Sequence, residues 1–134
     1  MSANGLILVV DDELRSIQAF IDELEIQGYT VICASTVEEC RGVLARASGI
    51  RLVILDMMLP PGERPAALTG EGIHTGLRLL SEIRSTFPTL PVLLFTNVDV
   101  RRLQFVCDSY THLIEKCSVF PFELPAEVRK LISE

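Results

Sequence analysis

The sequence predicts an α/β domain built on a parallel sheet of five strands. Short apolar runs alternate along the chain with segments whose apolar residues recur at helical spacing. Several of these runs are apolar without interruption, which is typical of strands covered by helices on both faces. Such an alternation implies right-handed crossovers between parallel strands. The predicted strands are 6–10, 29–34, 52–56, 91–96 and 112–116, with 29–34 the least apolar and therefore a candidate for the sheet edge.

Helices are predicted between and after these strands. The first ends at Gly28, because glycine readily adopts the left-handed conformation that closes many helices. Thr36 and Glu39 have the spacing of a capping box at the start of the second. Pro125 suits the first turn of the last. The predicted helices are 14–27, 36–47, 75–87, 99–108 and 125–132, although polar residues interrupt the apolar pattern in 99–108.

Composition limits the possible functions. The 134 residues, 49% hydrophobic and without an internal repeat or linker, fit a single domain over 1–134. A net charge of −6 argues against direct nucleic-acid binding, which needs a basic surface. No apolar run reaches membrane length and the N-terminus does not resemble a signal peptide, so we expect a cytoplasmic protein without a membrane anchor.

The cysteines and histidines suggest no metal centre. Four cysteines are scattered without CxxC spacing, which predicts reduced thiols that are mostly buried and neither a disulfide framework nor a zinc site. His74 and His112 have no second ligand nearby in the sequence, and we assign neither a role. The cysteines are Cys33, Cys40, Cys107 and Cys117.

Polar side chains stand where four of the predicted strands end. Because parallel strands point the same way, these side chains are expected to converge at one rim of the sheet, where ligands of open α/β folds bind. Three of them are carboxylates, which repel by about 4 kcal/mol per pair at an effective dielectric near 20. Such a site either raises a pKa or recruits a hard cation, and oxygen ligands favour Mg²⁺. The residues are Asp11, Asp12, Asp56, Thr96 and Lys116.

This set of residues suits phosphoryl transfer to a carboxylate. Asp56 is the candidate nucleophile. Lys116 offers a positive charge and Thr96 a hydroxyl donor to the phosphoryl oxygens. The protein would mainly position and neutralise the reacting groups.

In these five positions, and in Pro60 four residues after Asp56, the sequence resembles a response-regulator receiver domain of two-component signalling. The resemblance implies a flavodoxin-like fold with strand order 2-1-3-4-5 and helices on both faces. It also implies phosphoryl transfer to Asp56 from a phosphohistidine on a histidine kinase or histidine phosphotransfer protein. By the same resemblance, Asp12 and Asp56 bind Mg²⁺, Asp11 binds it more through water, and Met58 contributes its backbone carbonyl. Thr96 and Lys116 hold the phosphoryl group, and Thr96 shifts toward it.

The sequence departs from the family pattern in four places. The segment 57–74 is long for a compact α/β connection, where roughly 2–6 residues are usual, and is either a tolerated insertion or a loop that binds a partner. Ile114 replaces the usual aromatic residue, whose movement reports phosphorylation at the protein surface. Without that ring, this signal is muted or different. Cys117 replaces a proline, so that Lys116 is held less rigidly or the following loop traces differently. Asn97 replaces a small residue and either narrows access or adds a hydrogen bond.

Two positions that influence dephosphorylation in the family are apolar. Met58 and Val98 cannot orient a hydrolytic water, so we expect a long-lived phosphoryl state. The leading hypothesis is a phosphorylation-controlled switch that acts through a downstream effector and catalyses only its own phosphorylation and slow dephosphorylation. A homodimer is left open.

Two alternatives come from other classes of function. The first is an atypical receiver that docks partners without phosphorylation, favoured by the 57–74 segment, Ile114 and Cys117. The second is a Mg²⁺-dependent phosphatase with Asp56 as nucleophile. Phosphatases of that kind place an aspartate two residues after the nucleophile as general acid, and Met58, which stands there, cannot transfer a proton.

Overall fold

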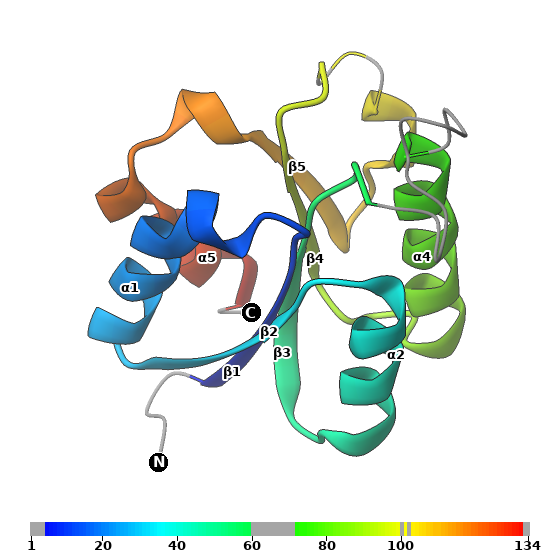
Figure 1. Ribbon diagram of the computed structural model, residues 1–134, viewed down its shortest axis with the longest axis horizontal. Helices are drawn as coiled ribbons and strands as arrows, with labels where there is room; N and C mark the ends of the chain where they lie inside the picture. The colour runs from blue at the N-terminus through cyan, green and yellow to red at the C-terminus, as the bar shows by residue number, and fades with distance from the viewer. Residues whose placement is uncertain (1–4, 60–71, 100, 102, 133–134) are drawn as a thin grey trace.

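A single sheet of five parallel strands forms the centre of the molecule (Figure 1). The computed structural model describes residues 5–59, 72–99, 101 and 103–132. The strand order is β2-β1-β3-β4-β5, which confirms the predicted topology and places 29–34 at an edge. The strands are β1 Gly5–Val10, β2 Tyr29–Ala34, β3 Ile50–Leu55, β4 Val92–Thr96 and β5 Thr111–Glu115.

Helices cover both faces of the sheet, as the sequence predicts. In Figure 1, α1 and α5 lie to the left of the sheet, and α2 and α4 lie to its right. A 3₁₀ turn over Leu14–Ile17 leads into α1. The helices are α1 Gln18–Ile26, α2 Val37–Arg46, α4 Gly72–Thr86 and α5 Leu124–Ile132. The third predicted helix therefore begins at Gly72, three residues earlier than expected.

The two faces of the sheet bury separate apolar cores. Ile7 and Val9 of β1 pack with residues of α1 and α5, whereas Leu8 and Val10 pack with residues of α2 and α4. Successive side chains of a strand point to opposite faces. Because both faces need apolar side chains, these strands read as unbroken apolar runs and not as an alternating pattern.

Local signals at the helix ends are largely confirmed. Thr36 Oγ1 accepts the Glu39 N–H at 3.0 Å, which caps α2. The Glu39 carboxylate accepts the N–H of Ser35 at 2.7 Å and not that of Thr36, so the reciprocal half of the capping box is displaced by one residue. Gly28 follows α1 with φ 99°, the left-handed conformation expected at the end of that helix.

The predicted helix over 99–108 is wrong for the part of this segment that the structure describes. There, only a 3₁₀ turn over Gln104–Val106 follows Leu103. Leu103 is fully buried, but Phe105 is 75% exposed, so the segment has too narrow an apolar stripe to pack as a helix. The carboxylate of Asp108 accepts the N–H groups of Tyr110 and Thr111, which stabilises a turn instead.

The cysteines are unpaired, but most are not buried. Only Cys40 lies in the core, while Cys33, Cys107 and Cys117 are exposed, so the expectation of mostly buried thiols is wrong. Cys33 lies on β2, an edge strand of the described sheet. Within the described ranges, no helix is both long and apolar enough to cross a membrane.

Candidate functional site

The ends of three neighbouring strands bring the predicted site residues together. Asp11 follows β1, Asp56 follows β3, and Thr96 is the last residue of β4. The ladder continues one step beyond the strands, since Asp11 N–H donates to Ala34 O at 3.0 Å and Asp56 N–H donates to Val10 O at 2.9 Å. Backbone pairing therefore fixes where both carboxylates leave the sheet.

Three carboxylates form a compact acidic cluster at this rim. Asp11, Asp12 and Asp56 each present an oxygen, and these oxygens lie within 4.8 Å of one another. Asp11 and Asp56 are buried and Asp12 is exposed, so the cluster opens to solvent on the Asp12 side. Burial raises the pKa of Asp12, and the negative charges of Asp11, Asp56 and Glu13 raise it further.

Lys116 connects two of the carboxylates. Its Nζ donates to Asp11 Oδ2 at 2.7 Å and to Asp56 Oδ2 at 3.2 Å. Burial alone lowers the pKa of the ammonium, but the hydrogen bonds and the two negative charges outweigh it, so the pKa lies above its usual value. The chain continues past Lys116 into a 3₁₀ turn over Lys116–Ser118, and every described peptide bond is trans. The loop therefore traces differently from a path that needs a cis bond before residue 117.

The second oxygen of Asp56 has its own donors. Thr96 Oγ1 donates to Asp56 Oδ1 at 2.8 Å, and the Met58 N–H donates to the same oxygen at 3.2 Å. The Val98 N–H donates to Thr96 Oγ1 at 3.3 Å, which orients the fully buried hydroxyl. Asp56 is thus held at Oδ1 by two neutral donors and at Oδ2 by a cation.

Two contributors to the site were not found from the sequence. The Glu13 N–H donates to Asp11 Oδ1 at 2.8 Å, so the acidic run Asp11-Asp12-Glu13 also supplies a backbone donor. Gly76 lies in α4 so close to Met57 that an added Cβ would stand 2.2 Å from the Met57 carbonyl oxygen. The signal for Gly76 was a glycine within a helical pattern, which often marks close packing.

The segment after Asp56 begins with alternating burial. Met57 and Leu59 are fully buried, whereas Met58 is 46% exposed beside the acidic cluster. Most of the remaining 57–74 segment lies outside the described residues, so neither interpretation of it is tested. Asn97 is exposed at the end of β4, and Ile114 is partly buried against the α1 and α5 core.

The donor set fits a hard divalent cation. All three groups of the cluster are carboxylate oxygens, and one side is open to the waters that Mg²⁺ retains. Sulfur and imidazole ligands, which would favour zinc, do not take part in any such cluster of described residues. These observations suggest Mg²⁺ binding at Asp11, Asp12 and Asp56.

Comparisons with known proteins point in one direction. No protein-family profile matches the sequence. A curated relative, the "Probable transcriptional regulator ycf27" of Porphyra purpurea, is 34% identical and aligns with 94% of this chain. The chain spans 46% of that relative, about half of its length.

Solved structures give the same fold over nearly the whole chain. A response regulator receiver domain protein from Clostridium thermocellum is 26% identical, with a TM-score of 0.74 and coverage of 96% of this chain and 94% of that one. The response regulator TrrA from Thermotoga maritima, solved in complex with Mg(2+)-BeF, is 28% identical, with a TM-score of 0.69 and coverage of 95% and 98%. A CheY-like receiver domain protein from Methanospirillum hungatei, 21% identical with a TM-score of 0.76, shares the fold over 98% and 95%.

The fold and its neighbours are those of response-regulator receiver domains, which confirms the resemblance drawn from the sequence. The strand order and the helices on both faces are shared with this class. A receiver fold supports a role as a switch in two-component signalling.

Proposed function

We propose that the chain is a phosphorylation-controlled switch with Asp56 as the phosphoryl acceptor. The observation that carries this proposal is the arrangement around the Asp56 carboxylate, with Thr96 and the Met58 N–H on one oxygen and Lys116 on the other. The donor is a phosphohistidine of a histidine kinase or a histidine phosphotransfer protein. The output passes to a downstream effector protein in the cytoplasm.

The chemistry is a displacement at phosphorus. An oxygen of Asp56 forms a bond to the phosphorus while the nitrogen–phosphorus bond of the donor breaks, and its electron pair stays on the imidazole. Lys116 and Thr96 donate hydrogen bonds to the phosphoryl oxygens, which exchanges their present bonds to the free carboxylate. When bound by Asp11, Asp12, Asp56 and the backbone carbonyl of Met58, Mg²⁺ supplies positive charge against the phosphoryl oxygens.

The same site argues against turnover of a separate substrate. Met58, which stands where a phosphatase of the aspartate-nucleophile type needs its general acid, is apolar and half-exposed. Val98, two residues after Thr96, is also apolar, and neither Met58 nor Val98 orients a water for hydrolysis. We propose that phospho-Asp56 is long-lived and that the chain catalyses only its own phosphorylation and slow dephosphorylation.

Intact-mass analysis tests the acceptor. With Mg²⁺ and phosphoramidate, which carries its phosphoryl group on nitrogen as phosphohistidine does, the wild type gains one phosphoryl group and Asp56→Asn gains none. Equal labelling of both proteins contradicts the assignment of Asp56. Decay of the label within seconds contradicts the long-lived state.

A phosphorylation-independent docking module is the second candidate. It is favoured by Ile114, which lies partly buried on β5 beside an open cavity where receivers carry a mobile aromatic ring. A partner that binds the wild type and Asp56→Asn equally, with and without phosphoramidate, distinguishes this candidate from the switch.

A further inference from the structure

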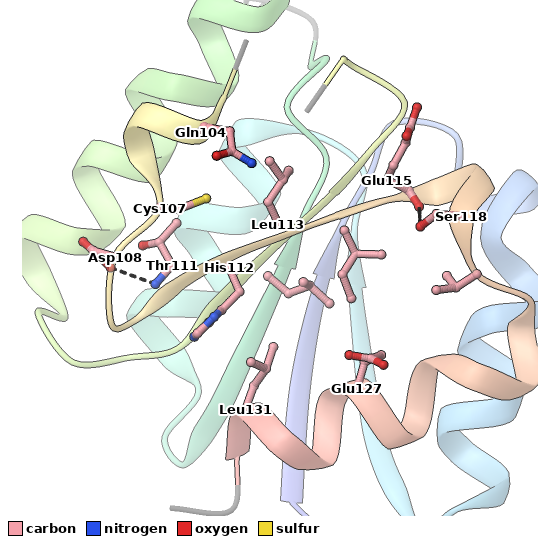
Figure 2. A pocket seen from close by; sticks show the side chains of 13 residues that line it. Gln104, Cys107, Asp108, Thr111, His112, Leu113, Glu115, Ser118, Glu127 and Leu131 are labelled. Carbon is pink, nitrogen blue, oxygen red and sulfur yellow. Dashed lines mark hydrogen bonds between the residues drawn. The ribbon is translucent and has the colours of Figure 1, made fainter. Parts of the chain in front are cut away.

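A large open cavity lies along β5, away from the acidic cluster. Its volume is about 680 Å³. Figure 2 shows β5 crossing this cavity, with Glu127 of α5 on one side and Gln104 and Cys107 on the other. Because β5 is the last strand of the described sheet and pairs there with β4 alone, its outer edge borders this space.

Backbone hydrogen bonds define which groups of β5 point outward. Tyr110 O accepts the N–H of Val92 at 2.8 Å and so faces β4. Thr111 faces the other way, because its N–H donates to Asp108 Oδ1 at 2.9 Å and its carbonyl accepts the Asp108 N–H at 3.0 Å. Consecutive residues of a parallel strand bond to opposite sides, so the N–H groups of Leu113 and Glu115 also face the outer edge.

Asp108 forms hydrogen bonds with both backbone groups of Thr111, the first outward-facing residue, and leaves the rest of the edge open. At the far end, the Glu115 carbonyl accepts the Ser118 hydroxyl at 2.7 Å. Among the described residues, no donor or acceptor occupies the outward N–H or C=O of Leu113. The middle of β5 therefore offers a short row of backbone groups to an added strand.

The side chains around this edge are acidic and apolar. Asp108, Glu115 and Glu127 line the cavity together with apolar residues that include Ile114 and Leu131. Within the described lining, no residue is a lysine or an arginine. Asp108 already accepts the N–H groups of Tyr110 and Thr111, and Glu127 pairs loosely with Lys130 at 3.5 Å. A strand that enters this space would therefore bury apolar side chains on β5 and α5 and meet more carboxylates than cations.

We propose that the β5 edge binds an extended, basic segment of a partner protein by strand addition. Backbone bonds to Leu113 and Glu115 hold the segment, and Asp108, Glu115 and Glu127 select lysine or arginine side chains. A second copy of this chain fits the edge less well, because pairing β5 with β5 brings carboxylates toward carboxylates. The proposal does not depend on phosphorylation of Asp56.

A short fluorescein-labelled peptide of alternating lysine and valine is the probe, and fluorescence anisotropy measures its dissociation constant. Leu113→Pro removes the outward N–H, and proline is tolerated on an edge strand where its nitrogen faces solvent. Leu113→Ala loses the same side chain but keeps the N–H, so it is the matched control. We expect Leu113→Pro to bind the peptide about tenfold more weakly than Leu113→Ala, as the loss of one or two hydrogen bonds implies.

Charge gives a readout that does not depend on whether the proline variant folds. The double variant Glu115→Gln with Glu127→Gln is expected to lose about tenfold in affinity, and a glutamate–valine peptide is expected not to bind. Equal binding to Leu113→Pro and Leu113→Ala, both folded by circular dichroism, overturns strand addition. Equal binding of the basic and acidic peptides, or a concentration-dependent dimer that Leu113→Pro abolishes, overturns the basic partner.

Discussion

The rim that carries Asp56 and the edge formed by β5 differ in how completely their polar groups are satisfied. At the rim, both oxygens of Asp56 are bonded, and the strands beneath it are buried on both faces. Along β5, the side chains from His112 to Glu115 are only partly buried, and one side of the backbone borders a cavity. The polar groups of the rim are therefore already satisfied within the described chain, whereas the edge leaves backbone groups that another chain could satisfy.

The largest expected effect is at the cation that joins two carboxylates at the rim. Lys116→Met removes charge-assisted hydrogen bonds to Asp11 and Asp56, which are worth roughly 1.5–3 kcal/mol each. We expect labelling of Asp56 by phosphoramidate to slow by about 100-fold. Intact-mass time courses measure it.

Lys130→Met is the matched control for this change. Lys130 is 70% exposed and forms only a loose pair with Glu127 at 3.5 Å. We expect wild-type labelling in this variant. A Lys116→Met protein that labels as fast as Lys130→Met would remove Lys116 from the site.

The next largest effect is expected on stability, at the close contact between α4 and the backbone beside Asp56. Gly76→Ala places a Cβ within 2.2 Å of the Met57 carbonyl oxygen and 2.7 Å of its Cα, so α4 or the backbone next to Asp56 must move. Overpacking of this kind costs about 1–3 kcal/mol in the free energy of unfolding. Urea denaturation measures the loss.

Gly42→Ala supplies the comparison within α2. A Cβ there meets only the flexible end of Arg46 at 3.2 Å, so alanine is expected to stabilise this helix by about 0.5–1 kcal/mol. If both alanine variants are equally stable, α4 does not press on the acceptor strand.

A smaller effect is expected at Thr96, where two substitutions distinguish the role of the hydroxyl group from that of the side-chain volume. Thr96→Ala removes the donor at 2.8 Å from Asp56 Oδ1, whereas Thr96→Ser keeps it. We expect Asp56 labelling to slow about tenfold in the alanine variant and to change little in the serine variant. Equal rates in the two variants would show that the hydroxyl takes no part.

The smallest expected effect is on the alkylation rate of a thiol beside the β5 edge. Cys107 lines the cavity, and burial together with Asp108 raises the pKa of its thiol, so its alkylation by iodoacetamide accelerates as the pH rises. The lysine–valine peptide is expected to slow alkylation of Cys107 a few-fold and to leave the exposed Cys33 unchanged. Burial raises the pKa of Cys40 to about 11, so Cys40 stays unmodified near neutral pH. Peptide mapping by mass spectrometry reads all three, and equal slowing of Cys107 and Cys33 would remove the peptide from the edge.

The rim was predictable from the sequence, and so was the place of the last strand at an edge of the sheet, but the cavity along that edge was not. Asp11, Asp56 and Thr96 directly end strands whose apolar runs are unmistakable, and parallel strand ends must share a rim. The cavity is lined in part by the segment before β5, where apolar residues at helical spacing predicted a helix. In that segment the Asp108 carboxylate stabilises a turn and Phe105 stays exposed, and such local hydrogen bonds leave no trace in the spacing of apolar residues.

Close approach is the other feature that sequence alone did not resolve. Gly76 reads as an ordinary weak point in a helix until its distance to Met57 is known. Met57 and Met58 look alike in the sequence, yet one is fully buried and the other 46% exposed, because alternation continues for a few residues past β3.

We propose above all that Asp56, held by Thr96 and Lys116, is the phosphoryl acceptor of a Mg²⁺-dependent switch. The most direct measurement is thermal unfolding of the wild type and Asp56→Asn with Mg²⁺ and beryllofluoride, a mimic of the phosphoryl group. We expect beryllofluoride to raise the Tm of the Mg²⁺-bound wild type and to leave the Tm of Asp56→Asn with Mg²⁺ unchanged. The same Tm in the wild type with and without beryllofluoride, or an equal rise in both proteins, would contradict it.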